Sequence, residues 1–289
     1  MITLKASAKI NLTLEVLGRR DDGYHDIVSV MQAIDLCDEV KLEPADEIAL
    51  ECSAPELQSD DNLALRAARM LAEVSGHPGG AHIILEKEVP VASGLGGGSS
   101  DAAAVLKGLN ALWGLGLSLD DLSRIAARLG SDVSFFLHGG TCLAQGRGET
   151  VRPLPPADIE WMVVLAPRIE AQDKTASAYA RMTESAFTKG ALTRKLAARI
   201  QGGGDVPPQF LFNAFDAIAF DVYPGLDRYW ETLSNLGARE IHVAGSGPSL
   251  YAPISRKEVG TAIQLLLTRT HGWDAFLVSP LPCTGESPP

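Results

Sequence analysis

Residues 94–101, which read GLGGGSSD, place four glycines and two serines directly before an alanine-rich run. Glycine backbones approach an anion with no Cβ in the way, and a helix that starts behind them aims the positive end of its dipole at that anion. Ser99 or Ser100 could also ligate a metal ion that rides on phosphates. The pattern predicts a phosphate site and a helix that begins near Asp101, where Asp101 could cap it; a flexible surface turn is the plainer alternative.

Two common phosphate motifs do not match this loop. A Walker A loop needs a lysine after its last glycine, and none follows here. A dinucleotide fingerprint would read Gly94, Gly96 and then Ser99, without a suitable strand before it or an acidic residue about 20 positions later. A Rossmann-type oxidoreductase is therefore disfavoured.

A second glycine loop, with Gly245, Ser246 and Gly247, lies between two predicted strands. By itself it is equally well a tight hairpin turn. Together with the first loop it gains weight, because glycine loops on both sides of a cleft are a common arrangement at nucleotide sites.

Three polar residues could carry acid–base or charge chemistry. Lys9 and Asn11 lie two residues apart in an alternating stretch and so share one face of a strand. A lone strand lysine ordinarily points to solvent. Asp132 stands at a junction between two helical patterns, and its spacing by itself favours a helix cap over a catalytic role.

Further candidates are aromatic or polar. Tyr24 and His25 are adjacent, and Thr175 and Tyr179 lie four apart, on one face of a helix that has begun by Thr175. Core packing is the default for such aromatic residues. Asn62, before a helical pattern, is by position a helix cap.

These residues need a scaffold of alternating strands and helices. Strands are expected at residues 2–18, 27–43, 48–53, 81–90, 161–167, 239–245, 249–254 and 274–279, with a hairpin at 141–154. Helices are expected at residues 60–76, 101–115, 118–130, 174–182, 191–200, 210–220, 225–237 and 257–270. The first of them would be capped by Asp60 or Asp61, and Ser118 with Asp121 resembles a capping box.

The element order indicates an α+β protein of two domains. The proline-rich residues 153–158 are the best boundary, which gives domains at residues 1–153 and 154–289. Residues 201–209 are expected to form a mobile loop, and the tail at residues 280–289 is expected to be frayed.

Composition restricts the function classes. The 289 residues carry 25 Lys and Arg against 36 Asp and Glu, a net charge of −11, so binding to nucleic acid or to a membrane surface is not expected. The four cysteines form no C-x-x-C pair, which fits free thiols in a reducing cytoplasm better than zinc or disulfides. The N-terminus does not read as a signal peptide, and no apolar run is long enough to span a membrane.

Four motifs occur in a fixed order: SAKINLTLEVLGRRDDGYH, GLGGGSSDAA, GSDVSFFLHGGTCLAQGRGE and VAGSGPSLYA. Together they resemble the GHMP kinase superfamily, over residues 2 to 279. Within it they are most similar to the branch that uses ATP to phosphorylate the 2-hydroxyl of 4-(cytidine-5′-diphospho)-2-C-methyl-D-erythritol in the non-mevalonate isoprenoid pathway. The resemblance implies a ribosomal-S5-like N-terminal domain, a ferredoxin-like C-terminal domain, ATP and Mg²⁺ as cofactors, and a monomer or weak homodimer.

The resemblance also implies catalytic roles. Asp132 would accept the proton of the substrate hydroxyl, and Lys9 would keep that carboxylate ionised and steady the phosphate. Asn11 would hydrogen-bond the erythritol hydroxyls. Tyr24 and Tyr179 would sandwich the cytosine, and His25 would pair with its polar edge.

The remaining roles implied by the resemblance concern the two loops. Asn62 would contact adenine, and Ser99 or Ser100 would hold Mg²⁺. The ATP phosphates would be wrapped by Gly94, Leu95, Gly96, Gly97, Gly98, Ser99 and Ser100. Thr175, Gly245 and Ser246 would bind the cytidine substrate.

Two rivals stay open. Another GHMP kinase, acting on homoserine or mevalonate, would have no base to stack on Tyr24 and Tyr179. A non-catalytic nucleotide sensor would be expected to have lost Lys9 or Asp132, and both residues are present.

Overall fold

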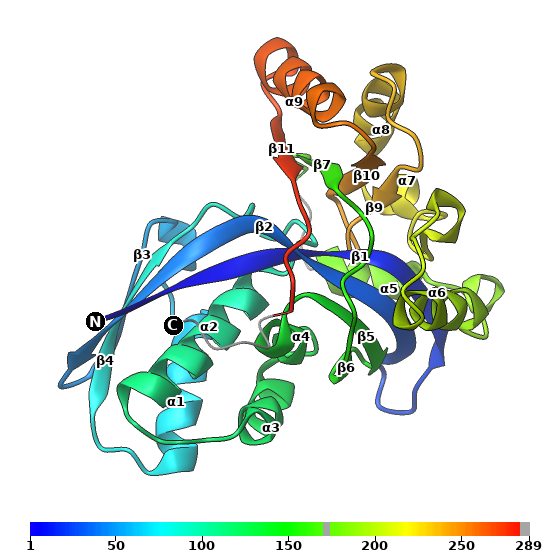
Figure 1. Ribbon diagram of the computed structural model, residues 1–289. Coiled ribbons are helices and arrows are strands. Elements are labelled where there is room, and N and C mark those ends of the chain that lie inside the picture. The colour runs from blue at the N-terminus through cyan, green and yellow to red at the C-terminus, as the bar shows by residue number, and fades with distance from the viewer. Residues whose placement is uncertain (170–173, 284–289) are drawn as a thin grey trace. The chain divides into compact units, whose positions relative to one another are not determined.

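The computed structural model describes residues 1–169 and 174–283, and these divide into two compact units (Figure 1). Unit 1 comprises residues 1–8, 36–91 and 96–138, and unit 2 comprises residues 9–35, 92–95 and 139 onward. Two long strands, β1 (Ile2–Arg19) and β2 (His25–Ala45), contribute residues to both units. The division is discontinuous along the chain, and the linear domain boundary after residue 153 stays a prediction.

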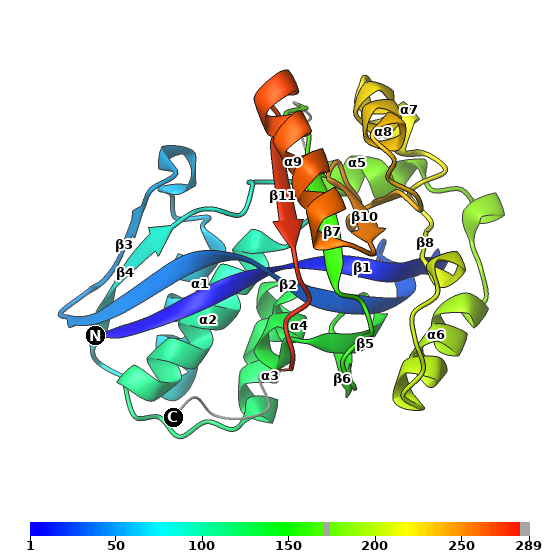
Figure 2. The same cartoon turned by 45° about the horizontal axis from the view of Figure 1, so that its top comes forward.

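Unit 1 pairs strands with a layer of helices. β3 (Ile48–Cys52) runs parallel to β4 (Gly80–Glu86), and β4 is antiparallel to the second half of β2. The helices are η1 (Pro55–Leu57), α1 (Leu63–Ser75), α2 (Gly97–Leu112), α3 (Leu119–Leu129) and α4 (Val133–His138). Figures 1 and 2 show α1 and α2 on one face of these strands.

The alanine-rich sequence of α2 explains how closely that helix packs. A Cβ at Gly108 would lie 2.3 Å from Leu42 Cδ1 and 2.6 Å from Leu4 Cδ1, so a larger residue there would require both leucine side chains to shift. Ala102 and Ala103 are also buried. The helix that follows the first glycine loop is therefore a core element of unit 1.

Unit 2 contains the first half of β2 paired with β5 (Thr141–Gly146), which forms the expected hairpin with β6 (Thr150–Leu154). A short strand, β8 (Phe212–Asn213), runs parallel to β1 at Thr13 and Leu14. A second, antiparallel sheet has the order β11–β7–β10–β9. Its strands are β7 (Trp161–Ala166), β9 (His242–Val243), β10 (Leu250–Ile254) and β11 (Asp274–Val278).

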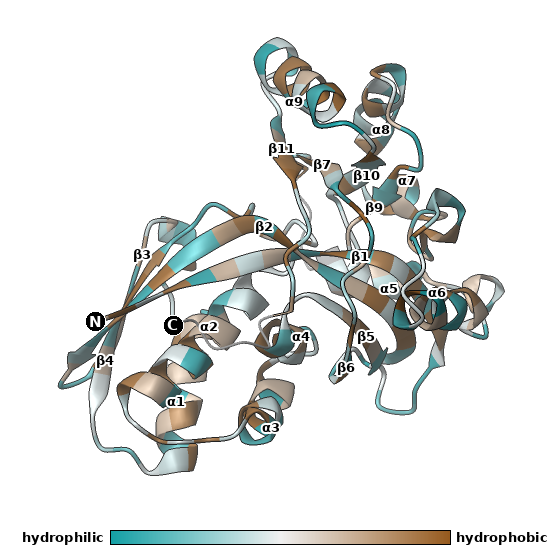
Figure 3. Ribbon diagram, viewed as in Figure 1, coloured by the Kyte–Doolittle hydropathy of each residue, from teal (hydrophilic) through white to brown (hydrophobic). Residues whose placement is uncertain are grey.

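The second sheet has ferredoxin-like topology, as expected. Its strands, numbered along the chain, lie in the order 4-1-3-2, with α8 before β9 and α9 between β10 and β11. α9 is amphipathic (Figure 3) and buries Gly260, Ile263 and Leu267. The helices of unit 2 are α5 (Lys174–Arg181), η2 (Glu184–Ala186), α6 (Ala191–Gln201), η3 (Pro208–Phe210), α7 (Ala219–Val222), α8 (Leu226–Asn235) and α9 (Lys257–His271).

Three sequence expectations about helices were wrong. Residues 210–220 do not form one helix but η3, β8, turns and the start of α7. α2 begins at Gly97, four residues before Asp101, because Gly96 takes the left-handed conformation and lets the helix start directly after it. α1 is capped by Asn62, not by Asp60 or Asp61. The capping box of Ser118 and Asp121 was confirmed.

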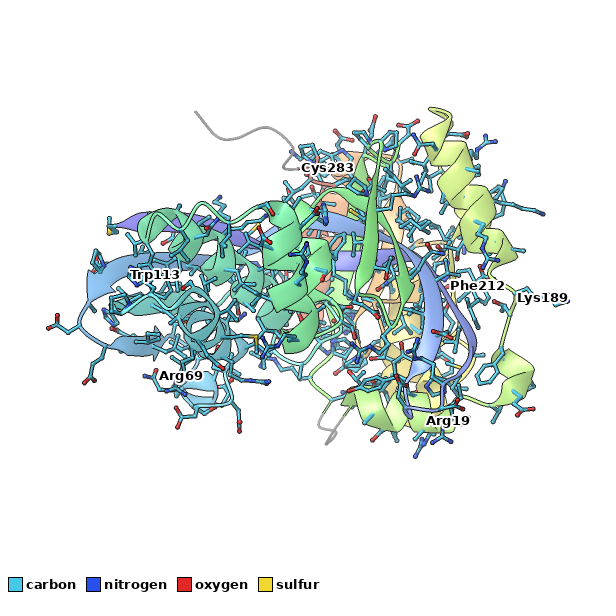
Figure 4. All side chains as sticks on the ribbon, turned by 90° about the horizontal axis from the view of Figure 1, so that it is seen from below. Arg19, Arg69, Trp113, Lys189, Phe212 and Cys283 are labelled. Atoms are coloured by element: carbon cyan, nitrogen blue, oxygen red, sulfur yellow. The ribbon has the colours of Figure 1, made fainter. Side chains whose placement is uncertain are left out.

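The C-terminal tail also differs from expectation up to Cys283, which is labelled in Figure 4. Pro280 pairs with Ile34 and Cys283 with Gly139, so this part of the tail is held in unit 2. Residues 284–289 of the tail lie outside the described residues. Residues 202–207 are irregular, and their mobility stays a prediction.

Candidate active site

Unit 2 buries a lysine–asparagine pair on β1. Lys9 and Asn11 are 3% and 2% exposed, and Lys9 Nζ donates a hydrogen bond of 2.8 Å to Asn11 Oδ1. Asn11 Nδ2 in turn donates to Ser29 Oγ at 2.8 Å. The default expectation of an outward lysine was therefore wrong. Burial of an ammonium group is costly, so a buried lysine held by polar neighbours indicates a functional position.

The two glycine loops meet next to this lysine, within unit 2. Gly94 has φ +87°, and a Cβ on it would lie 2.2 Å from Ala244 O and 3.0 Å from Gly247 O. Gly245 has φ +59°, and a Cβ on it would lie 2.8 Å from Lys9 Nζ and 2.9 Å from Gly94 O. Glycine at both positions is what permits the two backbones and the lysine to approach.

The same corner contains Thr175 and Ser246. Ser246 Oγ lies 3.3 Å from Thr175 Oγ1, and the carbonyl of Ser246 accepts a hydrogen bond of 2.8 Å from Tyr223 Oη. Thr175 is exposed and Ser246 is half-buried, so both hydroxyls are accessible. The structure thus brings together Lys9, Asn11, Gly94, Gly245, Ser246 and Thr175, six of the predicted site residues.

An aromatic surface lies one turn further along α5. The rings of Tyr179 and His25 are stacked at 5.0 Å with an interplanar angle of 30°, and Phe215 meets Tyr179 edge-on at 4.9 Å. Burial, and then the charge of Arg19, lower the pKa of His25, so its imidazole is neutral at neutral pH. A neutral imidazole offers one donor and one acceptor, as the polar edge of a base requires.

Tyr24 is 54% exposed. The guanidinium carbon of Arg147 lies 4.8 Å from the centre of its ring. In this structure Tyr24 contacts Arg147, and His25 is stacked on Tyr179. The sandwich of Tyr24 and Tyr179 around cytosine stays a prediction.

In unit 1, the first turn of α2 presents backbone amides that have no partner within the helix. Ser99 in this turn is half-buried, whereas Ser100 is 3% exposed and its amide donates to Gly96 O at 3.0 Å. Of the two serines, Ser99 is the more accessible to a ligand.

Sequence reasoning missed a buried ionic cluster behind this turn. Lys87 Nζ lies 2.5 Å from Asp38 Oδ2 and 2.7 Å from Asp101 Oδ2, and all three side chains are at most 7% exposed. Asp38 Oδ1 also accepts the amides of Glu88 and Val89. The cluster ties β2, the segment after β4 and α2 together. A Cβ on Gly97 would lie 3.2 Å from Lys87 Nζ, so the cluster reaches the first glycine of the helix.

Asp101 lies in the second turn of α2, so the expectation that it caps the helix was wrong. Burial raises the pKa of Asp101 to about 7; the positive charge of Lys87 opposes this rise, and the negative charge of Asp38 adds to it. In the sequence the cluster is indicated only by Asp101, a charged residue directly before the alanines at 102–104.

Asn62 and Asp132 lie in unit 1 at helix starts. Asn62 Oδ1 accepts the amide of Ala64 at 2.9 Å and Nδ2 donates to Leu57 O at 3.0 Å, so its side chain does cap α1. Contact of Asn62 with adenine stays a prediction. Asp132 is half-buried directly before α4, and its proximity to Lys9 also stays a prediction.

Among the described residues, no cluster of three His, Cys, Asp or Glu side chains could hold a metal ion. No helix of the described chain has the length and apolar content that crossing a membrane requires.

Comparison with known proteins shows the family to which the chain belongs. Residues 62–140 match the model of the GHMP kinases N terminal domain. A 4-diphosphocytidyl-2-C-methyl-D-erythritol kinase of Dehalococcoides mccartyi is 42% identical over 283 residues, which is 97% of this chain and 99% of the relative.

Solved structures of kinases also match this chain. A crystal structure of 4-(cytidine 5'-diphospho)-2C-methyl-D-erythritol kinase superimposes with a TM-score of 0.80 at 31% identity, over 96% of this chain and 99% of that one. A homoserine kinase from Cytophaga hutchinsonii has a TM-score of 0.72 at 20% identity, over 98% of this chain and 95% of that one, and shows the fold alone. The chain therefore belongs to the 4-diphosphocytidyl-2-C-methyl-D-erythritol kinase family of the GHMP kinases.

Proposed function

We propose that this chain transfers the γ-phosphoryl group of ATP to the 2-hydroxyl of 4-(cytidine-5′-diphospho)-2-C-methyl-D-erythritol. The observation that carries the proposal is the corner of unit 2 in which Lys9, Asn11 and Gly245 meet beside the hydroxyls of Thr175 and Ser246. It supplies a fixed positive charge and polar groups for a sugar alcohol. The aromatic pair of His25 and Tyr179, in the same unit, is suited to a base.

The transfer breaks the bond between the γ-phosphorus and the β–γ bridging oxygen and forms a bond from the substrate oxygen to that phosphorus. ADP leaves, and the hydroxyl proton must be accepted. We assign Asp132 as the acceptor, because the GSDV motif that contains it resembles the motif of the family's catalytic aspartate, and phosphoryl transfer requires mainly positioning and one group to orient the nucleophile.

Lys9 stabilises negative charge. Its ammonium group is held by Asn11 in a buried site, where a charge interacts more strongly than in water. Because the site is already ordered, little reorganisation is needed when charge develops on the transferred group.

The phosphates of ATP bind at the first turn of α2 and the loop from Gly94 to Ser100. The net charge of the chain is −11, so we assign the attraction to backbone amides and the helix dipole. The close packing of Gly94 and Gly97 keeps this backbone bare of side chains.

Mg²⁺ fits these residues as an ion that rides on the phosphates. The half-buried hydroxyl of Ser99 is the accessible protein ligand, and Ser100 is the alternative. When bound, the ion would neutralise phosphate charge while keeping several of its waters.

Recognition of cytosine falls to Tyr179, His25 and Tyr24. Stacking of a base on an aromatic ring contributes about 1–3 kcal/mol per base. The neutral His25 ring adds a donor and an acceptor for the base edge. Substrates without a base, such as homoserine or mevalonate, cannot use these contacts.

All four cysteines are free thiols, which agrees with a reducing compartment, and we place the enzyme in the cytoplasm as a monomer or weak homodimer.

The proposal is tested by coupled ADP release with Mg²⁺-ATP and, in parallel, the cytidine compound, homoserine or mevalonate. We expect turnover with the cytidine compound alone. Turnover with homoserine or mevalonate instead would contradict the proposed substrate.

A further inference from the structure

The segment that failed to form the expected helix, residues 210–220, holds the second glycine loop in place. It starts with Phe210, the last residue of η3, and continues through Leu211 into β8, which begins at Phe212 (labelled in Figure 4). The next residue, Asn213, is 1% exposed. A hydrophobic pattern of helical period predicted a helix here, but two side chains of the segment bind backbone groups of another element.

The side-chain amide of Asn213 makes three hydrogen bonds to backbone groups. Its Nδ2 donates to Val243 O at 2.7 Å and to Gly245 O at 2.8 Å, and its Oδ1 accepts the amide of Phe215 at 3.0 Å. An NH₂ group has two hydrogens; one is directed at Val243 in β9 and the other at Gly245 in the loop that follows.

Asp216 completes the attachment. Its Oδ1 accepts the amide of Val243 at 2.8 Å, and its Oδ2 lies 2.8 Å from Nδ1 of His242. Four groups of residues 242–245 are therefore bound by two side chains of one short segment.

The segment is itself fixed to the strand that carries Lys9 and Asn11. Asn213 pairs with Leu14 of β1, and the amide of Ala214 donates to Leu14 O at 2.9 Å. Asn213 thus connects β1 with Gly245, whose α-carbon must stay close to Lys9 Nζ.

We propose that Asn213 is a positioning residue, which sets the distance between the second glycine loop and the Lys9–Asn11 pair. The proposal rests on the proposed function, because it assumes that Gly245 and Ser246 bind the cytidine substrate. Asn213 does not touch the reacting atoms and acts through the Gly245 carbonyl.

The test is Asn213→Asp, a change of similar size that replaces both donors by oxygen. A carboxylate would face two carbonyl oxygens and repel them. Asn110→Asp is the matched control, because Asn110 makes the same kind of bonds, from Nδ2 to Leu117 O at 3.0 Å and from Leu117 N to Oδ1 at 2.9 Å, in unit 1 and outside the proposed site.

We expect Asn213→Asp to lower kcat/KM for the cytidine compound at least tenfold while the Kd for ATP changes less than threefold. Hydrogen exchange of amides in residues 241–249 should become faster. Asn110→Asp should change kcat/KM less than twofold and leave exchange in residues 241–249 as it is.

An unchanged kcat/KM in Asn213→Asp, or a parallel loss of ATP binding, would overturn the positioning role. If the wild-type protein does not turn over the cytidine compound, the proposed function has failed, and exchange alone decides: faster exchange confined to residues 241–249 supports the attachment, and unchanged exchange overturns it. If Asn213→Asp is insoluble, Asn213→Ser, whose hydroxyl cannot reach both carbonyls, is subject to the same criteria.

Discussion

The contact between the two glycine loops can be tested by one added methyl group. Gly94→Ala places a Cβ 2.2 Å from Ala244 O and 3.0 Å from Gly247 O, both backbone atoms that cannot turn aside as a side chain would. The residue also keeps φ +87°, which costs an alanine about 1–2 kcal/mol relative to glycine. Overpacking adds about 1–3 kcal/mol. The free energy of unfolding should therefore fall by about 2–5 kcal/mol.

Gly225→Ala separates the cost of the left-handed backbone conformation from the cost of overpacking. Gly225 has the same φ of +87°, but a Cβ there would meet no atom of the described residues within 4 Å, its chain neighbours aside. The free energy of unfolding of Gly225→Ala should therefore fall only by the conformational cost of about 1–2 kcal/mol. Urea unfolding of the two variants and the wild type measures the difference. If Gly94→Ala is no more destabilising than Gly225→Ala, the second loop does not lie against Gly94, and the geometry of the proposed site is wrong.

Three further predictions concern catalysis, recognition and pH. Asp132→Asn should reduce kcat at least a hundredfold while titration shows ATP binding within threefold of wild type; retention of full turnover would exclude Asp132 as proton acceptor. Tyr179→Ala should raise KM for the cytidine compound about 10- to 100-fold through lost stacking, with KM for ATP nearly constant; equal increases in both would contradict the assignment. Burial lowers the pKa of Lys107 from 10.5 to about 8. Below pH 8 this burial therefore destabilises the folded state by about 3 kcal/mol relative to a lysine of ordinary pKa, and the free energy of unfolding rises by about that amount as pH increases from 8 to 10.5. The free energy of unfolding of the wild type and of Lys107→Met, measured across this pH range, gives the contribution of Lys107. The same pH dependence in both proteins would contradict the lowered pKa of Lys107.

Periodicity in the sequence was enough to predict most elements of this fold. The strand at residues 27–43, the helix at 257–270 and the hairpin at 141–154 were confirmed because their local patterns agree with their packing. The helix at 210–220 failed because Asn213 and Asp216 bind distant backbone groups. Such long-range hydrogen bonds leave no local signal and override helical periodicity.

The site residues, too, could be selected from the sequence only where a local pattern marks them. The glycine loops have an unusual local composition, so they could be selected from the sequence, whereas the aromatic residues were selected only through the family resemblance, because core packing is their default. The inward direction of Lys9 could not, because it depends on Asn11 and Ser29. The cluster of Lys87, Asp38 and Asp101 joins residues far apart in the chain, and only the fold brings them together.

An acidic chain that binds a triphosphate and a diphosphate must concentrate its positive potential locally. Here the net charge is −11, yet Lys9 is buried beside the second glycine loop, whereas the charge of Lys87 behind the first loop is offset by Asp38 and Asp101. Backbone amides and a few fixed ammonium groups interact strongly at short range, and they do not attract polyanions to the surface in general.

The most direct test of the account is phosphorus NMR of the reaction with Mg²⁺-ATP, comparing the cytidine-diphospho methylerythritol with methylerythritol phosphate that lacks cytidine. The account predicts a new phosphomonoester and one equivalent of ADP with the cytidine compound, its diphosphate intact, and no product without cytidine. No product from the cytidine compound would contradict the proposed function, and equal products from both would contradict recognition of the base by Tyr179 and His25.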